Sequence, residues 1–399
     1  MAELKIELEH VLGTRHLPST AATVDEVLAQ NGIPRTMVQT YFLRGERMSV
    51  IPGWTRLDEV PADVDVVLVR ALRNTLFDTI LPWAPGPALP AGYGVGFQAI
   101  ATEPGGRAVR HGTVLDETAA KALVSGEVGE FVEEYAVAER GCVFGVSGGG
   151  DSNALAYGLS AALPPEHLTA FTLVFADVMT RAAADRATVL CQDLGIDHRV
   201  YSEVDTALLL GMTTSLDQLY SDFSDAFGTE ALHFFGTFLI LKAARAIGRQ
   251  SGFTDLAFGY NREDLLAELL FMIMNGRAPL SYPVRQIGEQ RIVMPVWKAP
   301  KLLLDACHPS FSMENYRERD AHTTRQRSLA FYLGHSLDSV YPSFGTSFLD
   351  GASRAFAGHF GELRHYRELD VFVTSDATPE RLDRVAAVLR RHFPGEQTA

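Results

Sequence analysis

Hydrophobic positions along the chain switch between a spacing of two and a spacing of three to four, which predicts alternating strands and helices. Near the N-terminus, residues 4–8 alternate as a strand does, and residues 23–32 have helical spacing that stops at Asn-Gly. Strand-like runs follow at 38–43, 46–51 and 64–70. This order predicts a small α/β module over residues 1–72.

A second, larger pattern follows a Pro- and Gly-rich linker at 82–92 and a helix expected at 116–138. Strand candidates at 142–146, 168–175 and 255–258 alternate with helix candidates at 181–194 and 231–249. Such alternation predicts an α/β fold with a doubly wound parallel sheet. The expected divisions are 73–140 for the linker and helix, 141–310 for the sheet domain, and 311–399 for a small α+β region that ends in a strand at 369–374 and a helix at 379–393.

Composition narrows the class of protein. The chain has 399 residues, of which 47% are hydrophobic and 21% charged, as in ordinary globular proteins with two or three domains. No apolar run reaches the ~20 residues that span a bilayer, and the charged N-terminus is unlike a signal peptide, so no membrane partner is expected. The net charge of −14 disfavours a generally basic surface for nucleic acid. Three separated cysteines (Cys142, Cys191, Cys307) predict no disulfide framework and suit a reducing cytoplasm.

The segment at 147–152 reads Ser-Gly-Gly-Gly-Asp-Ser and lies between an apolar strand and a helix. Consecutive glycines let the backbone approach a ligand closely, and N–H groups at a helix N-terminus favour an anion. Ser147 and Ser152 add hydroxyl donors, and Asp151 can orient Mg²⁺ or a phosphate-bound water. The segment therefore predicts a pyrophosphate site, although it has neither a Walker lysine nor the Gly-x-Gly-x-x-Gly spacing of a dinucleotide site.

A second block of polar residues follows the strand candidate at 255–258. Asn261 and Asp264 lie one helical turn apart, and Asp264 and Glu268 are an i,i+4 pair on one helical face. Two carboxylates at a helix start near a phosphate loop are suitable Mg²⁺ ligands. The structural alternative is a capped amphipathic helix whose acids are solvated. The position of the block after a strand favours the functional interpretation.

Ser-Gly-Gly-x-Asp-Ser resembles the pyrophosphate loop of the N-type ATP pyrophosphatases, the PP-loop or adenine nucleotide α-hydrolase-like superfamily. The second block resembles the Gly-His-x-x-Asp-Asp-x-x-Glu-Thr helix of the tRNA(Ile)-lysidine synthetase and tRNA 2-thiocytidine synthetase branch. Tyr260 replaces the His, and Glu263 replaces the first Asp. The run at 291–301 resembles the Arg-Pro-Leu segment that closes the same domain, with Met294 in place of the Arg.

The resemblance implies a HUP-like PP-loop domain that uses ATP and Mg²⁺. The catalytic residues that it implies are Ser147, Asp151 and Asp264. The ATP-binding residues are Ser147, Gly148, Gly149, Gly150, Asp151, Ser152, Asp177 and Asn261, with Asp177 at the adenine or ribose edge. The implied metal ligands are Asp151, Asp264 and Glu268. Lys298 and Lys301 are candidates for contact with phosphate or with an acidic substrate.

The implied reaction is that of an ATP-dependent ligase, which adenylates a carbonyl or amide oxygen, releases pyrophosphate and forms a C–N bond on a tRNA base or a small molecule. Thiolation is the alternative. Residues 233–241 have no Cys-x-x-Cys and Gly150 replaces the usual loop lysine, which favours the ligase; Cys307 is the candidate reactive thiol. A third alternative is an α/β-hydrolase with Ser147 as nucleophile and His359 or His365 as base, because Gly-x-Ser-x-Gly also fits 145–149. A non-catalytic nucleotide sensor is a fourth.

The N-terminal module resembles a β-grasp module of the sulfur-carrier kind. A sulfur carrier ends in a free Gly-Gly, whereas this chain continues through Arg70-Ala71-Leu72. The module is therefore expected to dock a protein partner rather than to carry sulfur. The resemblance also leaves a homodimer open.

Overall fold

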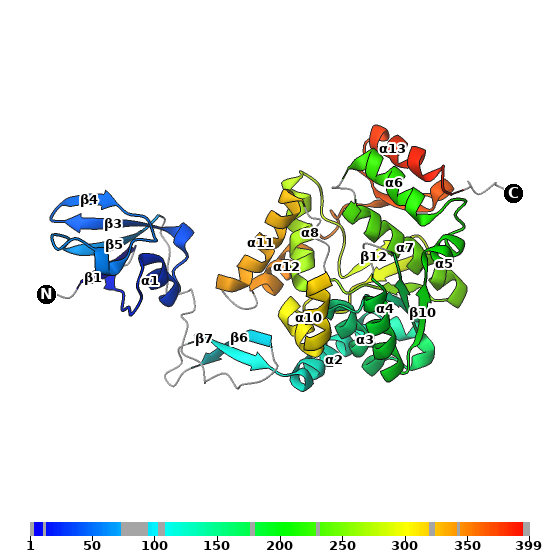
Figure 1. Ribbon diagram of the computed structural model, residues 1–399, viewed down its shortest axis with the longest axis horizontal. Helices are drawn as coiled ribbons and strands as arrows, with labels where there is room; N and C mark the ends of the chain where they lie inside the picture. The colour runs from blue at the N-terminus through cyan, green and yellow to red at the C-terminus, as the bar shows by residue number, and fades with distance from the viewer. Residues whose placement is uncertain are drawn as a thin grey trace. The chain divides into compact units, whose positions relative to one another are not determined.

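The computed structural model describes residues 4–10, 13–72, 95–102, 108–175, 180–228, 232–318, 324–340 and 344–393 (Figure 1). The chain divides into two units. The first contains Met1–Pro90, Phe97–Thr113 and Ser336–Phe344, and the second contains Ala91–Gly96, Val114–His335 and Gly345–Ala399. In the described part of the chain, no helix has the length and apolarity needed to cross a bilayer.

The N-terminal module is a five-stranded sheet with one helix packed on it (Figure 1). Its strands are β1 (Lys5–His10), β2 (Gly13–His16), β3 (Val38–Arg44), β4 (Arg47–Val50) and β5 (Val66–Ala71), and its helix is α1 (Val24–Gln30). The order is β2-β1-β5-β3-β4, in which β1 and β5 are parallel and the other pairs antiparallel. This is the arrangement expected of a β-grasp module.

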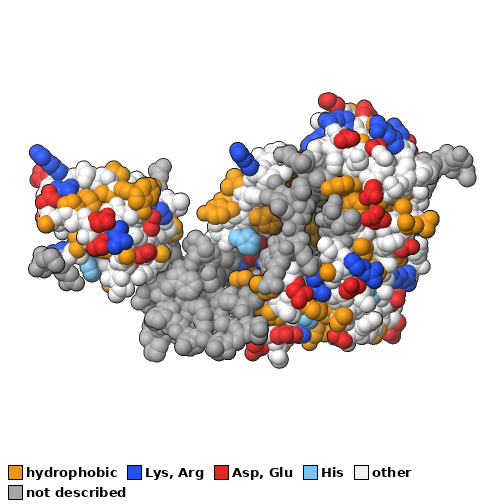
Figure 2. Space-filling model, viewed as in Figure 1, with side chains coloured by type: hydrophobic (Ala, Val, Ile, Leu, Met, Phe, Trp, Pro, Cys, Tyr) orange, Lys and Arg blue, Asp and Glu red, His pale blue; other side chains and the backbone are white. Residues whose placement is uncertain are grey.

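The two faces of this sheet differ in burial. A capping box between Thr23 and Glu26 starts α1, whose apolar residues pack in one core with the inward residues of β1 and β5. Side chains alternate along a strand, so the outward positions of β4 lie on the side opposite α1. Met48 and Val50 are 46% and 65% exposed there, and Figure 2 shows hydrophobic side chains gathered on the surface of the module.

The second unit is built on a six-stranded sheet that confirms the predicted α/β class. Its strands are β8 (Cys142–Gly145), β9 (Leu168–Leu173), β10 (Asp197–Tyr201), β11 (Asp255–Ala257), β12 (Val284–Ile287) and β13 (Gln290–Val293). The order is β10-β9-β8-β11-β13-β12, and every pair is parallel except β12 with β13. If the five parallel strands are numbered by their order in the chain, they lie side by side in the order 3-2-1-4-5. The direction in which the chain crosses the sheet therefore reverses between β8 and β11.

A set of helices precedes, connects or directly follows the strands of this sheet. They are α2 (Glu117–Glu134), α3 (Gly150–Ala162), α4 (Arg181–Asp193), α5 (Glu203–Leu209), α6 (Leu216–Phe227), α7 (Leu232–Ser251), α8 (Arg262–Met274) and α9 (Lys301–Cys307). Parallel connections are right-handed, so connections that travel in opposite directions place their helices on opposite faces of the sheet. Ligands bind outside the carboxyl ends of the strands where the direction reverses, which here is between β8 and β11.

The C-terminal region combines helices with a small sheet, as predicted. It contains α10 (Pro309–Glu318), α11 (Arg325–Val340), α12 (Phe344–Ala355), the antiparallel pair β14 (Leu363–Tyr366) and β15 (Val371–Thr374), and α13 (Pro379–Leu389). The turn between β14 and β15 is held on α7, where Lys242 donates to the carbonyl of Leu369 at 2.9 Å and Arg245 pairs with Asp370. α13 packs on α6.

Several predicted elements differ from the structure. Strand β2 was not predicted, and β6 (Val95–Thr102) pairs with β7 (Ala108–Leu115) where only a linker and a helix were expected. Helix α2 ends at Glu134 rather than at 138, because Ala136 has a left-handed φ of 51° that stops it. The predicted linker at 82–92 lies outside the described residues.

Candidate functional site

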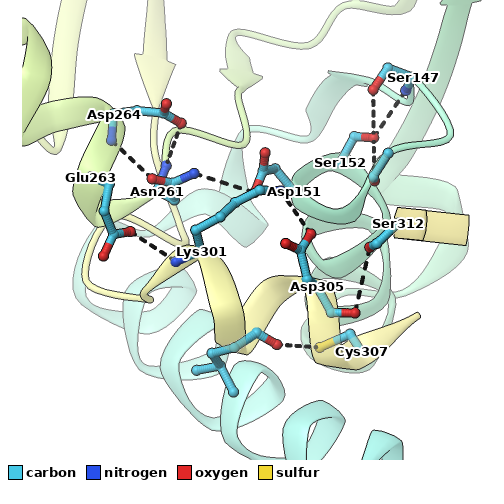
Figure 3. A network of polar contacts seen from close by, with 12 residues as sticks. Ser147, Asp151, Ser152, Asn261, Glu263, Asp264, Lys301, Asp305, Cys307 and Ser312 are labelled. Atoms are coloured by element: carbon cyan, nitrogen blue, oxygen red, sulfur yellow. Dashed lines mark hydrogen bonds and ion pairs between the residues drawn. The ribbon is translucent and has the colours of Figure 1, made fainter. Parts of the chain in front are cut away.

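Two turns meet where the direction of the sheet reverses (Figure 3). One follows β8 and enters α3, with Gly149 as the N-cap of that helix. The other follows β11 and enters α8, with Asn261 as its N-cap. Asn261 and Asp264 form a capping box: the Asn261 side chain accepts from Asp264 N at 2.9 Å, and Asp264 accepts from Asn261 N at 3.2 Å. Because β8 and β11 are adjacent and parallel, both turns lie side by side at the carboxyl ends of these strands.

Hydrogen bonds through Ser152 close the first turn into a loop. The Ser152 hydroxyl accepts from Ser147 N at 3.0 Å and donates to the Gly149 carbonyl at 3.2 Å. Its oxygen also lies 3.1 Å from the Ser147 hydroxyl. Because the Ser152 proton is used on Gly149, Ser147 is the donor in that last bond. The loop is thus held in its turn by its two serines.

All three glycines of the loop are closely packed, and Gly148 also has a backbone conformation that favours glycine. Gly148 has a φ of 69°, and a Cβ on it would lie 2.5 Å from the carbonyl oxygen of Ala183 on α4. A Cβ on Gly150 would lie 2.1 Å from Asp305 Oδ1 on α9. At Gly149 the nearest atom is the Asn315 side-chain nitrogen on α10, at 2.8 Å. A larger residue at 148 or 150 therefore requires its neighbours to move.

Acidic and basic side chains from three helices converge beside the loop (Figure 3). Asp151 accepts a hydrogen bond from the Asn261 side chain at 3.3 Å and from Lys301 Nζ at 2.9 Å. Lys301 Nζ also donates to Asp305 at 2.8 Å. The backbone N–H of Lys301 donates to Glu263 at 2.8 Å, and Glu263 in turn pairs with Arg262. α3, α8 and α9 are thereby joined at one point.

The electrostatics of this cluster favour a bound cation. Burial, and then the neighbouring Asp151 carboxylate, raise the pKa of Asp264 to about 7. Burial also raises the pKa of Asp151, against the opposing effect of Lys301. Burial disfavours the Lys301 ammonium, but Asp151 and Asp305 outweigh it and raise the pKa of Lys301. Three carboxylates are therefore close to a single ammonium, and an added cation would lower their repulsion.

The structure brings together most of the predicted site residues. Those that lie at the meeting of the two turns are Ser147, Gly148, Gly149, Gly150, Asp151, Ser152, Asn261 and Asp264. Glu268 lies further along α8 and pairs with Arg285 at 2.6 Å. Lys298 packs over the ring of Trp297, and Asp177 lies outside the described residues.

Two residues of the cluster, Glu263 and Asp305, were not predicted to have these roles. Glu263 caps the N-terminus of α9. This contact joins residues 38 positions apart, so no local sequence pattern predicts it. Asp305 lies four residues after Lys301 on α9, so their i,i+4 pairing was visible in the sequence.

The three cysteines are buried on separate elements: Cys142 on β8, Cys191 on α4 and Cys307 on α9. Burial raises the pKa of Cys142, and it raises those of Cys191 and Cys307 to about 12. Cys307 donates to the carbonyl of Leu303 at 3.6 Å. These thiols are protonated at neutral pH and packed in the core, so they are poor nucleophiles in this conformation.

Within the described residues, no three His, Cys, Asp or Glu side chains are grouped as a ready-made metal site. Mg²⁺ does not need such a group, because it is commonly held by one or two carboxylates, substrate phosphates and water. Asp151 and Asp264 fit that pattern. The buried and separated cysteines do not fit an iron–sulfur cluster, which is held by several cysteine thiolates at one point.

Comparisons with known proteins place the sheet domain among known folds. No family model matches the chain, and no curated protein matches its sequence. The chain is similar to the solved structure of the U34-tRNA thiolase NcsA from Methanococcus maripaludis with its [4Fe-4S] cluster. The TM-score is 0.50 and the identity 17%, over 62% of this chain and 83% of that chain. The sheet domain therefore has the PP-loop fold that the sequence predicted.

Two synthetases are more distant in structure. The NH3-dependent NAD synthetase from Campylobacter jejuni subsp. jejuni NCTC 11168 has 17% identity and a TM-score of 0.35, over 63% of this chain and all of that one. The NMN synthetase from Francisella tularensis has 14% identity and a TM-score of 0.32, over 69% and 94% of the two chains.

Proposed function

We propose that the chain is an ATP-dependent ligase that adenylates a carbonyl or amide oxygen of its substrate, releases pyrophosphate, and forms a C–N bond with release of AMP. The observation that carries this proposal is the meeting of the Ser147–Ser152 turn with Asn261 and Asp264 at the reversal point of the sheet (Figure 3). It combines a loop suited to phosphate with buried carboxylates suited to a cation. The PP-loop fold, whose known members use ATP, supports it.

The loop and Lys301 supply the groups that ATP needs. The N-terminus of α3 presents backbone N–H groups and a favourable helix dipole to the pyrophosphate. Lys301 adds a cation held beside Asp151. Both kinds of donor stabilise the charge that develops on pyrophosphate as it leaves the α-phosphate. Because these groups are fixed before ATP arrives, much of the proposed catalysis is positioning.

Asp151 and Asp264 are the proposed Mg²⁺ ligands. Mg²⁺, when bound, neutralises the phosphates of ATP and relieves the repulsion between these two carboxylates. Asn261 orients both acids, since its side chain donates to Asp151 and accepts from the backbone of Asp264. Glu268, the third acid predicted from the sequence, is engaged by Arg285, so we propose the first two as the ligands.

Burial of the cysteines supports a nitrogen nucleophile over sulfur transfer by this chain. A thiolase that carries sulfur or a cluster on its own cysteines needs an accessible thiolate, and Cys307 is buried. The hydrolase alternative also lacks support. The Ser147 hydroxyl bonds to Ser152, whereas His365 bonds to Asp370 and His359 to the carbonyl of Ala357.

Exchange of radiolabelled pyrophosphate into ATP tests the reaction directly. We expect exchange that depends on Mg²⁺ and on a substrate drawn from a panel of tRNA, nucleobases and small carboxylates, with AMP as the final nucleotide product. Asp151→Ala is the matched variant and should give no exchange. Formation of ADP and phosphate, or labelling of Ser147 by a fluorophosphonate, would refute the proposal. The substrate that supports exchange separates the tRNA and small-molecule alternatives.

For the N-terminal module we propose docking to a protein partner through the outer face of its sheet. Met48 and Val50 are 46% and 65% exposed on β4, on the face opposite α1. Large apolar side chains grouped on a surface commonly mark a binding site.

A further inference from the structure

Lys301 is held at both ends by carboxylates from different helices. Glu263 on α8 accepts from its backbone N–H at 2.8 Å, and Asp305 on α9 accepts from its ammonium at 2.8 Å. The first bond caps α9, whose own N-cap residue, Pro300, makes no side-chain cap. The second bond spans one helical turn. Together they fix where α9 begins and where the lysine side chain points.

Both carboxylates are well buried. The side chains of Glu263 and Asp305 are each 7% exposed, and that of Lys301 is 14% exposed. A charge-assisted hydrogen bond at such burial is stronger and more directional than one on the surface. By contrast, the pair of Arg390 and Glu368 has exposures of 55% and 56% and is expected to contribute little.

Asp305 also fills the space beside the loop that a side chain at position 150 would occupy. A Cβ on Gly150 would lie 2.1 Å from Asp305 Oδ1 and 2.7 Å from the Ser312 hydroxyl. The space that a side chain at 150 would occupy is therefore filled by the residue that holds Lys301. Gly150 and Asp305 form a matched pair: the loop has no side chain there, and α9 provides the ammonium instead.

We propose that Asp305 and Glu263 are positioning residues, which act by holding the Lys301 ammonium beside Asp151 for contact with the phosphates of ATP. The inference rests on the proposed function and deepens it, because it assigns roles to two acids that touch neither the loop serines nor the proposed metal. Asp305 fixes the direction of the Lys301 side chain, and Glu263 fixes the position of the Lys301 backbone.

A double-mutant cycle on ATP binding tests the proposal without turnover. Binding of ATP is measured by calorimetry, with and without Mg²⁺, for the full chain and for Lys301→Met, Asp305→Asn, Glu263→Gln and the two double variants. Loss of a charge-assisted contact should weaken ATP binding by about 10- to 100-fold in Lys301→Met. Asp305→Asn should weaken it by about 3- to 30-fold, because a neutral amide holds the ammonium less firmly.

The result expected is strong coupling: in the Lys301→Met background, Asp305→Asn and Glu263→Gln should change ATP affinity by less than about 2-fold. Additive losses, or an Asp305→Asn variant that binds ATP as the wild type does, overturn the proposal. Glu368→Gln, at the exposed pair with Arg390, is the control and should leave affinity unchanged.

A measurement of folding keeps the outcomes distinct. Thermal melting identifies any variant that fails to fold, and the variants that melt as the wild type does then decide the test. If the wild-type chain itself binds no ATP, the proposed function fails. If the wild type binds ATP and the cycle is additive, only the positioning roles fail.

Discussion

Asp151 links the three helices of the site, α3, α8 and α9. It lies in the first turn of α3, accepts from Asn261 on α8 and from Lys301 on α9, and its carboxylate is close enough to Asp264 to raise the pKa of that residue. Burying several acids so close together costs stability unless a cation compensates. Such an arrangement is typical of a functional site rather than of a packing solution.

Replacement of Asp151 by Asn should separate function from stability. We expect pyrophosphate release to fall by about 100-fold or more, because the proposed metal loses a charged ligand. The free energy of unfolding should stay within about 1 kcal/mol of the wild type, since removing one buried like charge offsets the weakened contact with Lys301. Turnover assays and urea denaturation measure the two quantities. Retained turnover would exclude Asp151 from catalysis.

The conformation of Gly148 can be tested in the same way. Gly148→Ala combines a φ of 69° with a Cβ placed 2.5 Å from the Ala183 carbonyl oxygen. We expect a loss of about 2–4 kcal/mol in unfolding free energy, and loss of ATP binding. Gly211→Ala is a matched control, because Gly211 has a φ of 64° with open space around it. It should lose only about 1 kcal/mol. Equal losses in the two variants would show that the contact with α4 is unimportant.

At the scale of elements, the sequence predicted what local patterns determine. The β8 strand and the loop were predicted because apolar residues, glycines and a helix follow one another without interruption. Strand β2 was missed because its four residues are all exposed and include no large apolar side chain. The β6–β7 pair was missed because the neighbouring Pro- and Gly-rich run indicated a linker. Contacts between elements, such as Glu263 with α9, were beyond any local pattern.

The junction between α9 and α3 should make stability depend on pH. His308 follows α9 and packs edge-on against Tyr157 of α3 and stacked on Phe311. Burial, and then Lys121, lower the pKa of His308 to about 4, against the opposing effect of Glu117. The neutral form is therefore favoured in the folded protein. Its contribution to stability is complete above pH 6.5 and is lost as the pH falls from 6.5 to about 4.

Chemical denaturation at pH 4.5 and at pH 7.5 measures this effect. We expect His308→Phe to reduce the loss of unfolding free energy between these two pH values by about 1–2 kcal/mol, with allowance for partial exposure of the ring. An unchanged difference between the two pH values would mean that His308 is protonated in the folded protein without cost.

For the molecule as a whole, the two units have separate cores. The core of the N-terminal module combines apolar residues of α1 with those of β1, β3 and β5. The candidate site is built from α3, α8 and α9 of the other unit. No residue of the site in its described part comes from the module. The proposed adenylation and the proposed docking are thus expected to be separable.

Removal of residues 1–72 tests that separation. A chain that begins at residue 73 should keep its ATP affinity and its pyrophosphate exchange within about 2-fold on a small substrate, because every contact at Asp151 is retained. Residues 1–72 alone should unfold cooperatively, since domains of that length can fold independently when they bury a core of their own. Circular dichroism and calorimetry of both fragments measure these outcomes. A truncated chain that folds but no longer exchanges pyrophosphate would show that the module takes part in the reaction itself.

If exchange is kept and only a protein partner is lost, Met48→Asp and Val50→Asp in the full chain should reproduce that loss, because both side chains are exposed on the outer face of the module.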